Sequence, residues 1–413
     1  MIPTIADRVQ SRVDRFSYGR VVGEWGGRHL LHGLPPSPDA VLLNSNDYLG
    51  LAGDHRVAEA MCTALAAGGA RFTSGAFVDD GHPQAIVERA LADHMRAPAG
   101  ILCQSGWDAN VGLLQTIADP RTPVYVDSFA HMSMWHGAKV AGAPLHPFRH
   151  NFPGHLREEI RTYGPGIIAV DSIYSSNGSR APLAQLCDVA EQTGSLLVVD
   201  ESRSLGTDGP LGAGAVAALG LTERVPFRVA SLSGALAGRA GFVAANGVDF
   251  VDYFRMESFP AVFSSTLLPH DLAGISAALT AVRTDDWRRE RLVQVSERVR
   301  QGLGALGFDL EAAAAHIVSL QAGPDLRAMA IRDFLEARGI FGTVLCPPAT
   351  ARNRTLVRFC LHAALTDLEI DRILLACKEV RDAFGAIPPP PPPVRGTAPI
   401  PKQTPVQTGD STR

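Results

Sequence analysis

The chain has 413 residues, of which 46% are hydrophobic and 19% are charged, the composition of a globular protein long enough to bury sizeable cores. A formal net charge of −4 gives no electrostatic reason to expect binding to nucleic acid or to an anionic membrane. We expect a cytoplasmic protein, because the N-terminus lacks the apolar core of a signal peptide and no run of about 18 apolar residues could span a membrane.

Cysteine and lysine usage narrows the chemistry. The 6 cysteines lie far apart and form no C-x-x-C pair, which argues against a zinc site or a disulfide scaffold and suits a reducing compartment. Only three of the 38 lysines and arginines are lysines. A reaction that requires a side-chain amine from this chain must therefore use Lys139, Lys378 or Lys402.

Between residues 95 and 250, short apolar runs alternate with longer segments of helical periodicity. Nearly continuous apolar runs predict strands that are buried on both faces. Helices between such strands predict an α/β fold with a mostly parallel central sheet covered on both sides. The predicted strands are the runs 99–106, 122–128, 166–172, 195–202, 227–233 and 240–246.

The pattern changes after about residue 275. A strongly amphipathic helix over 285–307 is followed by a strand-like run at 316–323, further helices and a second strand-like run at 355–361, which together predict a smaller α+β unit. We expect this unit to share its face with the N-terminal segment. The predicted domains are an N-terminal segment (1–50), a large domain (51–275), a small C-terminal domain (276–386) and a disordered Pro-rich tail (387–413).

Polar residues follow the predicted strands at the edge where ligands bind in open α/β sheets. They are Ser105, Asp127, Ser172, Asp200, Ser231 and Ser233. Ser105 and Gly106 come directly before a predicted helix, whose free N–H groups and dipole could hold a phosphate or could simply form a strand-to-helix turn.

Two further residues have a functional and an ordinary interpretation. Asp200, at the end of a buried strand, needs a cationic partner, which could be a protonated pyridine nitrogen or a structural arginine. His131, four residues beyond Asp127, could stack on a planar ligand or could be a satisfied turn residue.

Taken together, the motifs "NSNDYLGLAGDHRV", "QSGWDANVGLLQTI", "VYVDSFAHMS", "VVDESRSLGTDGPLGAG" and "FSSTLLP" resemble the α-oxoamine synthases in order and spacing. These are fold-type-I pyridoxal 5'-phosphate (PLP) enzymes that condense an amino acid with an acyl-CoA. Several motifs are most similar to the α-hydroxyketone autoinducer synthases of bacterial quorum sensing. The resemblance covers roughly residues 15–385 and implies the PLP fold type I.

The resemblance implies a role for each matching residue. Asp200 would pair with the cofactor's ring nitrogen, His131 would stack on the ring, and Ser172 would lie near its edge. Arg358 would bind the amino-acid carboxylate through its bidentate guanidinium. Ser265 and Thr266 would reach the phosphate in a partner subunit, which implies a homodimer. The expected phosphate-binding residues of the same subunit are Ser105, Gly106, Trp107, Ser231 and Ser233.

The sequence departs from the family at two positions in this expected site. The family's lysine, which holds PLP as a Schiff base and moves a proton, belongs at Gly234, where glycine can do neither. Arg203 stands where the family usually has a histidine beside the cofactor's phenolate oxygen, and arginine cannot give up its proton. The expected catalytic positions are thus His131, Arg203 and the altered position 234.

Three interpretations follow. The chain could be an acyltransferase that binds PLP noncovalently, as a substrate aldimine or as pyridoxamine phosphate, and uses an amino acid with an acyl-CoA or acyl-carrier thioester. It could be a non-catalytic subunit, for instance in a heterodimer with a lysine-bearing homologue. It could also transfer acyl groups without PLP. The retained Asp200, His131, Ser105 and Arg358 favour the first, since a pocket without a ligand has no physical need for a buried carboxylate facing a ring nitrogen.

Overall fold

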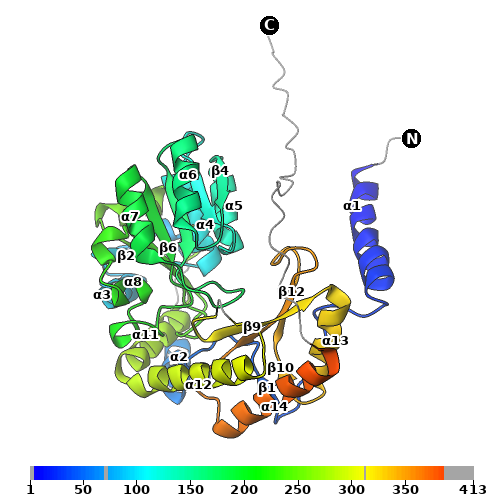
Figure 1. The fold of residues 1–413 in the computed structure, drawn as a ribbon. Helices are drawn as coiled ribbons and strands as arrows, with labels where there is room; N and C mark the ends of the chain where they lie inside the picture. Colours follow the sequence, from blue (N-terminus) through cyan, green and yellow to red (C-terminus); the bar gives the residue numbers. More distant parts are fainter. Residues whose placement is uncertain (1–3, 69–72, 311–312, 386–413) are drawn as a thin grey trace.

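The computed structural model describes residues 4–68, 73–310 and 313–385, and its largest sheet has seven strands and lies among the helices of the larger lobe (Figure 1). The strands are β2 (Ala99–Cys103), β3 (Val124–Asp127), β4 (Leu145–Phe148), β5 (Ile167–Asp171), β6 (Leu196–Asp200), β7 (Phe227–Ser231) and β8 (Gly241–Ala245). Their order in the sheet is β2-β8-β7-β6-β5-β3-β4. All six predicted strands are confirmed. The edge strand β4 was not predicted, because its sequence "LHPF" is too polar to stand out as a buried run.

The sheet is mostly parallel, as expected. The pairs from β7 through β6, β5 and β3 to β4 are parallel, whereas β8 pairs antiparallel with both β7 and β2. Consequently β8 alone runs against the other strands, and the carboxyl ends of the rest meet at one edge. The functional side chains of the sheet are found at this edge.

Helices cover both faces of the sheet, and alternate strand residues point into two separate cores. Ile168 and Val170 belong to one core with side chains of α6 and α7, whereas Ile167 and Ala169 belong to the other core with side chains of α4 and α5. This explains why each strand is apolar on both faces. The helices are α2 (His55–Ala67), α3 (Pro83–His94), α4 (Gly106–Ile117), α5 (Met132–Val140), α6 (Pro153–Tyr163), α7 (Leu183–Thr193), α8 (Ala215–Ala218), α9 (Asp249–Glu257), α10 (Phe259–Val262) and α11 (Pro269–Thr284), with the short turns η2 (Gly75–Phe77), η3 (Pro210–Gly212) and η4 (Thr222–Arg224).

The C-terminal part forms a smaller α+β unit around a three-stranded antiparallel sheet in the order β11-β12-β9. Its last helix begins at a capping box in which the Thr366 hydroxyl and the Glu369 carboxylate satisfy each other's backbone N–H groups. Its elements are α12 (Asp286–Ala305), β9 (Ile317–Gly323), α13 (Asp325–Glu336), β10 (Ile340–Phe341), β11 (Thr343–Leu345), β12 (Thr355–Cys360) and α14 (Asp367–Phe384).

The N-terminal segment consists of α1 (Ile5–Asp14), the π-type helical turn η1 (Arg15–Glu24) and the short strand β1 (Val41–Leu42), which pairs in parallel with β10. Trp25 and Leu30 are buried in the core of the C-terminal unit, as the expected shared face requires. The proposed boundary between residues 275 and 276 falls inside the continuous helix α11. The Pro-rich tail lies outside the described residues. Within the described ranges, no helix is both long and apolar enough to cross a membrane.

Candidate functional site

A cavity of about 200 Å³ lies at the carboxyl ends of the central strands. It is formed by the N-terminal ends of α4 and α5 together with the residues that follow β5, β6 and β7. The residues that line it are Ser105, Gly106, Trp107, Asn110, His131, Asp171, Ser175, Asp200, Ser202, Arg203, Ser231 and Ser233. Most of the predicted cofactor-binding residues therefore meet in one cavity.

The first turn of α4 packs directly against the end of β7. Ser105 caps the helix, since its hydroxyl accepts from the Asp108 N–H at 3.1 Å. A Cβ added to Gly106 would lie 2.5 Å from the Ser231 Cβ, so only glycine allows this approach. The helix N-terminus thus opens into the cavity beside the Ser231 and Ser233 hydroxyls, a suitable seat for an anion.

Asp200 is 5% exposed at the end of β6, and backbone and amide groups hold its carboxylate. Its Oδ1 accepts from the Ser202 N–H at 2.7 Å and its Oδ2 accepts from the Asn110 side-chain amide at 2.7 Å. No ion pair involving Asp200 occurs among the described residues. Arg203 is near enough to attract Asp200 electrostatically but does not pair with it directly, which leaves the carboxylate open to a cationic ligand group.

His131 caps α5 and lines the cavity with its ring. Its Nδ1 lies 2.7 Å from the Ser133 hydroxyl, and its backbone N–H donates to Asp171 Oδ1 at 3.1 Å. Burial lowers the pKa of His131, which favours the neutral ring. Burial also raises the pKa of Asp171 well above its ordinary value, and the nearby Asp200 adds to this shift. The Trp107 ring stands edge-on to His131 at 6.0 Å between centroids.

Gly234 lies in the turn between β7 and β8, next to the cavity wall but not among the lining residues. A Cβ added there would lie 3.1 Å from the Ser202 carbonyl oxygen and 3.1 Å from Tyr48 Cε2. Neither lysine in the described residues lines the cavity. Lys139 is exposed at the end of α5, and Lys378 is exposed on α14.

Arg203 lines the cavity with its guanidinium, which is hydrogen-bonded only to neutral side chains among the described residues. Its Nη1 donates to Asn46 Oδ1 at 2.9 Å and to the Tyr48 hydroxyl. Burial raises the pKa of Tyr48 to about 12 against the pull of Arg203, so the phenol remains protonated and neutral. No salt bridge involving Arg203 occurs in the described part of the chain. The guanidinium therefore remains available to an anionic group of a ligand.

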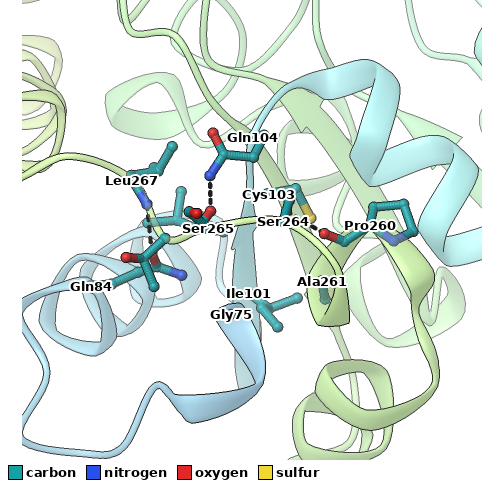
Figure 2. Close-up of a pocket in the computed structure, with 12 residues that line it drawn as sticks. Gly75, Gln84, Ile101, Cys103, Gln104, Pro260, Ala261, Ser264, Ser265 and Leu267 are labelled. Carbon is teal, nitrogen blue, oxygen red and sulfur yellow. Dashed lines mark hydrogen bonds between the residues drawn. The ribbon is translucent and has the colours of Figure 1, made fainter. Parts of the chain in front are cut away.

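Besides Gly234, four predicted site residues do not line the main cavity. Ser172 lies beneath it, where its hydroxyl donates to the Asp200 carbonyl oxygen at 2.9 Å. Arg358 adjoins it on β12 and donates to the Ser175 carbonyl oxygen at 2.9 Å. Ser265 and Thr266 line a second, smaller cavity of about 20 Å³, and Figure 2 shows the side-chain amide of Gln104 donating to the Ser265 carbonyl oxygen there.

Sequence reasoning missed Asn110, Asp171, Ser175 and Ser202 as cavity residues. Asn110 lies one helical turn beyond Gly106, so helical periodicity places it on the same side of α4. Asp171 and Ser202 are direct neighbours of residues that were singled out. Their closeness in the sequence to the predicted site residues could therefore have identified these three residues.

The fold and the cavity define a protein of the PLP fold type I. The chain belongs to the aminotransferase class I and II family, whose model matches residues 38–376. It is 40% identical over 377 residues to a CAI-1 autoinducer synthase from Vibrio campbellii (strain ATCC BAA-1116), covering 90% of this chain and 94% of that protein. It is 32% identical to a serine palmitoyltransferase from Caulobacter vibrioides (strain NA1000 / CB15N), covering 86% and 89% respectively. The predicted relationship to the α-oxoamine synthases is confirmed by these relatives.

Solved structures agree with the fold. A lysine-to-alanine variant of the serine palmitoyltransferase from S. paucimobilis, with a bound PLP–myriocin aldimine, superposes with a TM-score of 0.82 at 25% identity. The match covers 93% of this chain and 100% of that one. The prediction of the fold class is thereby confirmed.

Proposed function

We propose that the chain is an α-oxoamine synthase-type acyltransferase that binds PLP noncovalently and joins an amino-acid-derived substrate to an acyl-CoA or acyl-carrier thioester. One observation carries the proposal: the Asp200 carboxylate is buried at the cavity, and among the described residues it is hydrogen-bonded to the Asn110 amide and the Ser202 N–H but forms no direct ion pair. A buried carboxylate is costly unless a positive charge meets it. The protonated pyridine nitrogen of PLP would supply that charge.

The residues of the cavity fit the remaining groups of PLP. The N-terminus of α4 with the Ser231 and Ser233 hydroxyls suits the phosphate, and the neutral His131 ring suits a face of the pyridine. Bound there, PLP supplies an electron sink that stabilises negative charge at a substrate carbon. A cavity of about 200 Å³ leaves the acyl chain outside this part of the site.

The charged residues of the site then each have a role that their chemistry allows. Asp200 keeps the ring nitrogen protonated, and Arg203 provides a fixed positive charge that cannot move a proton. Arg358, which lies 2.9 Å from the Ser175 carbonyl oxygen, would bind the substrate carboxylate. With glycine at 234, no residue of the turn after β7 can form a Schiff base.

Relatives support both the reaction class and the binding mode. CAI-1 autoinducer synthase, 8-amino-7-oxononanoate synthase and serine palmitoyltransferase all match this chain over at least 80% of its length. The serine palmitoyltransferase in which a lysine is replaced by alanine still carries a PLP adduct. We infer that the quorum-sensing autoinducer synthases provide the best guide to the reaction.

The first prediction concerns the missing covalent bond. We expect PLP to bind reversibly, and borohydride treatment of the complex to leave no pyridoxyl group on the protein by intact mass. A Schiff base to the protein requires an amine, and both described lysines are exposed and absent from the cavity lining. An adduct on Lys139, Lys378 or Lys402 would contradict this proposal, and dialysis that fails to remove PLP would weaken it in the same direction.

The second prediction concerns assembly. Phe77, Phe259 and Phe263 are 75%, 59% and 82% exposed, and each lies within two positions along the chain of a residue that lines the smaller cavity. The rings of Phe259 and Phe263 also meet, with 6.0 Å between their centroids. Exposed aromatic residues of this kind are typical of a protein interface. We therefore expect a homodimer at micromolar concentration by sedimentation, and a shift towards monomer in Phe263→Asp. Leu368→Asp on α14 is the control, because Leu368 is 71% exposed away from this surface.

A different partner would change the interpretation. If the chain purifies only with a lysine-bearing homologue and binds no PLP alone, the non-catalytic subunit becomes the better description. A monomer at micromolar concentration would contradict the shared site.

A further inference from the structure

Three side chains beside the cavity form a hydrogen-bonded relay that the proposed chemistry does not use. Asp127, fully buried at the end of β3, has its Oδ1 2.9 Å from His150 Nδ1. The opposite ring nitrogen, His150 Nε2, lies 2.9 Å from the Ser179 hydroxyl. The order carboxylate–imidazole–hydroxyl is the order found in serine hydrolases, where the hydroxyl is the nucleophile.

The contacts of Ser179 argue against a nucleophile. The Ser179 hydroxyl donates to Asn177 Oδ1 at 2.8 Å, and Asp127 accepts from the Phe129 N–H at 2.8 Å. The hydroxyl proton is therefore directed towards the Asn177 side chain. Ser179 is also only 4% exposed, which leaves a substrate carbonyl little access.

The relay instead fixes a turn. Residues 174–179 close on themselves, because the Tyr174 N–H donates to the Ser179 carbonyl oxygen at 2.9 Å and the Gly178 N–H donates to the Tyr174 carbonyl oxygen at 2.9 Å. The His150 ring is held in place by Phe129, stacked at 4.2 Å, and by the edge of Tyr174 at 4.4 Å. The end of β3 is thereby joined to the turn through His150.

This turn touches both the cavity and the C-terminal unit. Ser175 lines the cavity, and its carbonyl oxygen accepts from Arg358 Nη1 at 2.9 Å. Arg358 is 9% exposed, and its Nε is buried without a partner. The orientation of the guanidinium therefore depends on where the Ser175 carbonyl points.

We propose that His150 is a positioning residue for Arg358. The relay of Asp127, His150 and Ser179 fixes the turn 174–179, and the turn holds the guanidinium where a ligand carboxylate can reach it. The ligand class is an α-amino acid, and in this respect the inference rests on the proposed function.

The test distinguishes the contribution of the ligand's carboxylate to binding from that of its amine. L-Alanine and ethylamine carry similar amines, but only L-alanine carries a carboxylate. Each is titrated into the PLP-loaded protein, and the absorbance change of the bound PLP gives the two dissociation constants. Their ratio reports the carboxylate preference, and a separate titration reports the affinity for PLP itself.

We expect Ser179→Ala and His150→Phe to lower the carboxylate preference by about fivefold, the loss of one well-oriented hydrogen bond, with unchanged affinity for PLP. Ser179→Thr, which keeps the hydroxyl, should retain the preference. Arg358→Met should remove it, and adding His150→Phe to Arg358→Met should cause no further loss, because coupled residues are not additive.

Several outcomes overturn the proposal. An unchanged carboxylate preference in both Ser179→Ala and His150→Phe would refute it, as would equal losses for L-alanine, ethylamine and PLP, which indicate general destabilisation. Labelling of Ser179 by a fluorophosphonate would assign it as a nucleophile instead. A wild-type protein that binds no PLP fails the proposed function, whereas one that binds PLP and prefers L-alanine, unaffected by the relay variants, fails this inference alone.

Discussion

The variant Gly234→Lys with Arg203→His is expected to bind PLP covalently, with a new visible absorbance band and a pyridoxyl group fixed to residue 234 by borohydride. The effect is the largest we expect, because it changes reversible binding into a covalent bond. Mass spectrometry of the reduced, digested protein locates the adduct. The wild type, treated identically, should carry none.

The geometry at Gly234 allows a side chain. Gly234 does not have a positive φ, so a lysine at this position meets no backbone strain. A Cβ would lie 3.1 Å from both the Ser202 carbonyl oxygen and the Tyr48 ring, so these neighbours must move by a few tenths of an ångström. Arg203 bonds to Tyr48 beside this position, and its charge opposes a second cation. Gly234→Lys alone should therefore form less adduct than the double variant.

The control is Gly234→Met with Arg203→His, which adds a side chain of comparable length without an amine. It should bind PLP and yield no adduct. A folded double lysine variant that binds PLP but remains free of adduct would show that position 234 does not face the cofactor aldehyde. The assignment of the lost lysine would then be wrong.

Replacing Asp200 by alanine is expected to weaken PLP binding more than tenfold, at least about 1.4 kcal/mol. The reason is the loss of the only carboxylate that we assign to the protonated ring nitrogen. Asp200→Asn keeps an acceptor for the Ser202 N–H, at 2.7 Å in the wild type, and removes the charge. It should resemble alanine in affinity but be closer to the wild type in thermal stability.

A change in the ligand tests the same contact from the other side. An analogue of PLP with carbon in place of the ring nitrogen should bind the wild type more weakly than PLP, and the two should bind Asp200→Ala alike. If Asp200→Ala lowers the melting temperature without changing the affinity for PLP, Asp200 is a structural residue. The cofactor proposal would then lose its main support.

The sequence predicted every strand of the central sheet except β4, because each of these strands is buried on both faces and its apolar run is continuous. The ends of these runs placed Ser105 and Asp200 correctly, since parallel strands share one functional edge. Asn110 was missed because its role depends on a contact with Asp200, 90 positions away along the chain. For the same reason, the sequence did not predict that Tyr48 packs against Gly234. Contacts between distant elements leave no periodic pattern in a single sequence.

The predictions for the C-terminal part divide in the same way. The strand that carries Arg358 was predicted from its apolar run, but the contact of Arg358 with the Ser175 carbonyl oxygen joins two separate sheets. Likewise, α11 continues through the predicted boundary at residue 275, because amphipathic periodicity does not reveal which unit a helix joins. The role of each site residue beyond its position stays a prediction.

The crossing of α4 over the end of β7 has a consequence for how this protein can change. A Cβ at Gly241 would lie 2.1 Å from the Ser105 carbonyl oxygen, and one at Gly106 would strike Ser231, so main chain meets main chain on this side of the cavity. Random mutagenesis should leave both glycines untouched in every surviving clone. Arg203, by contrast, lines the cavity with a side chain that can be replaced without moving the main chain. Laboratory selection for new ligands should thus yield proteins that keep the glycine contacts and differ at side chains such as Arg203.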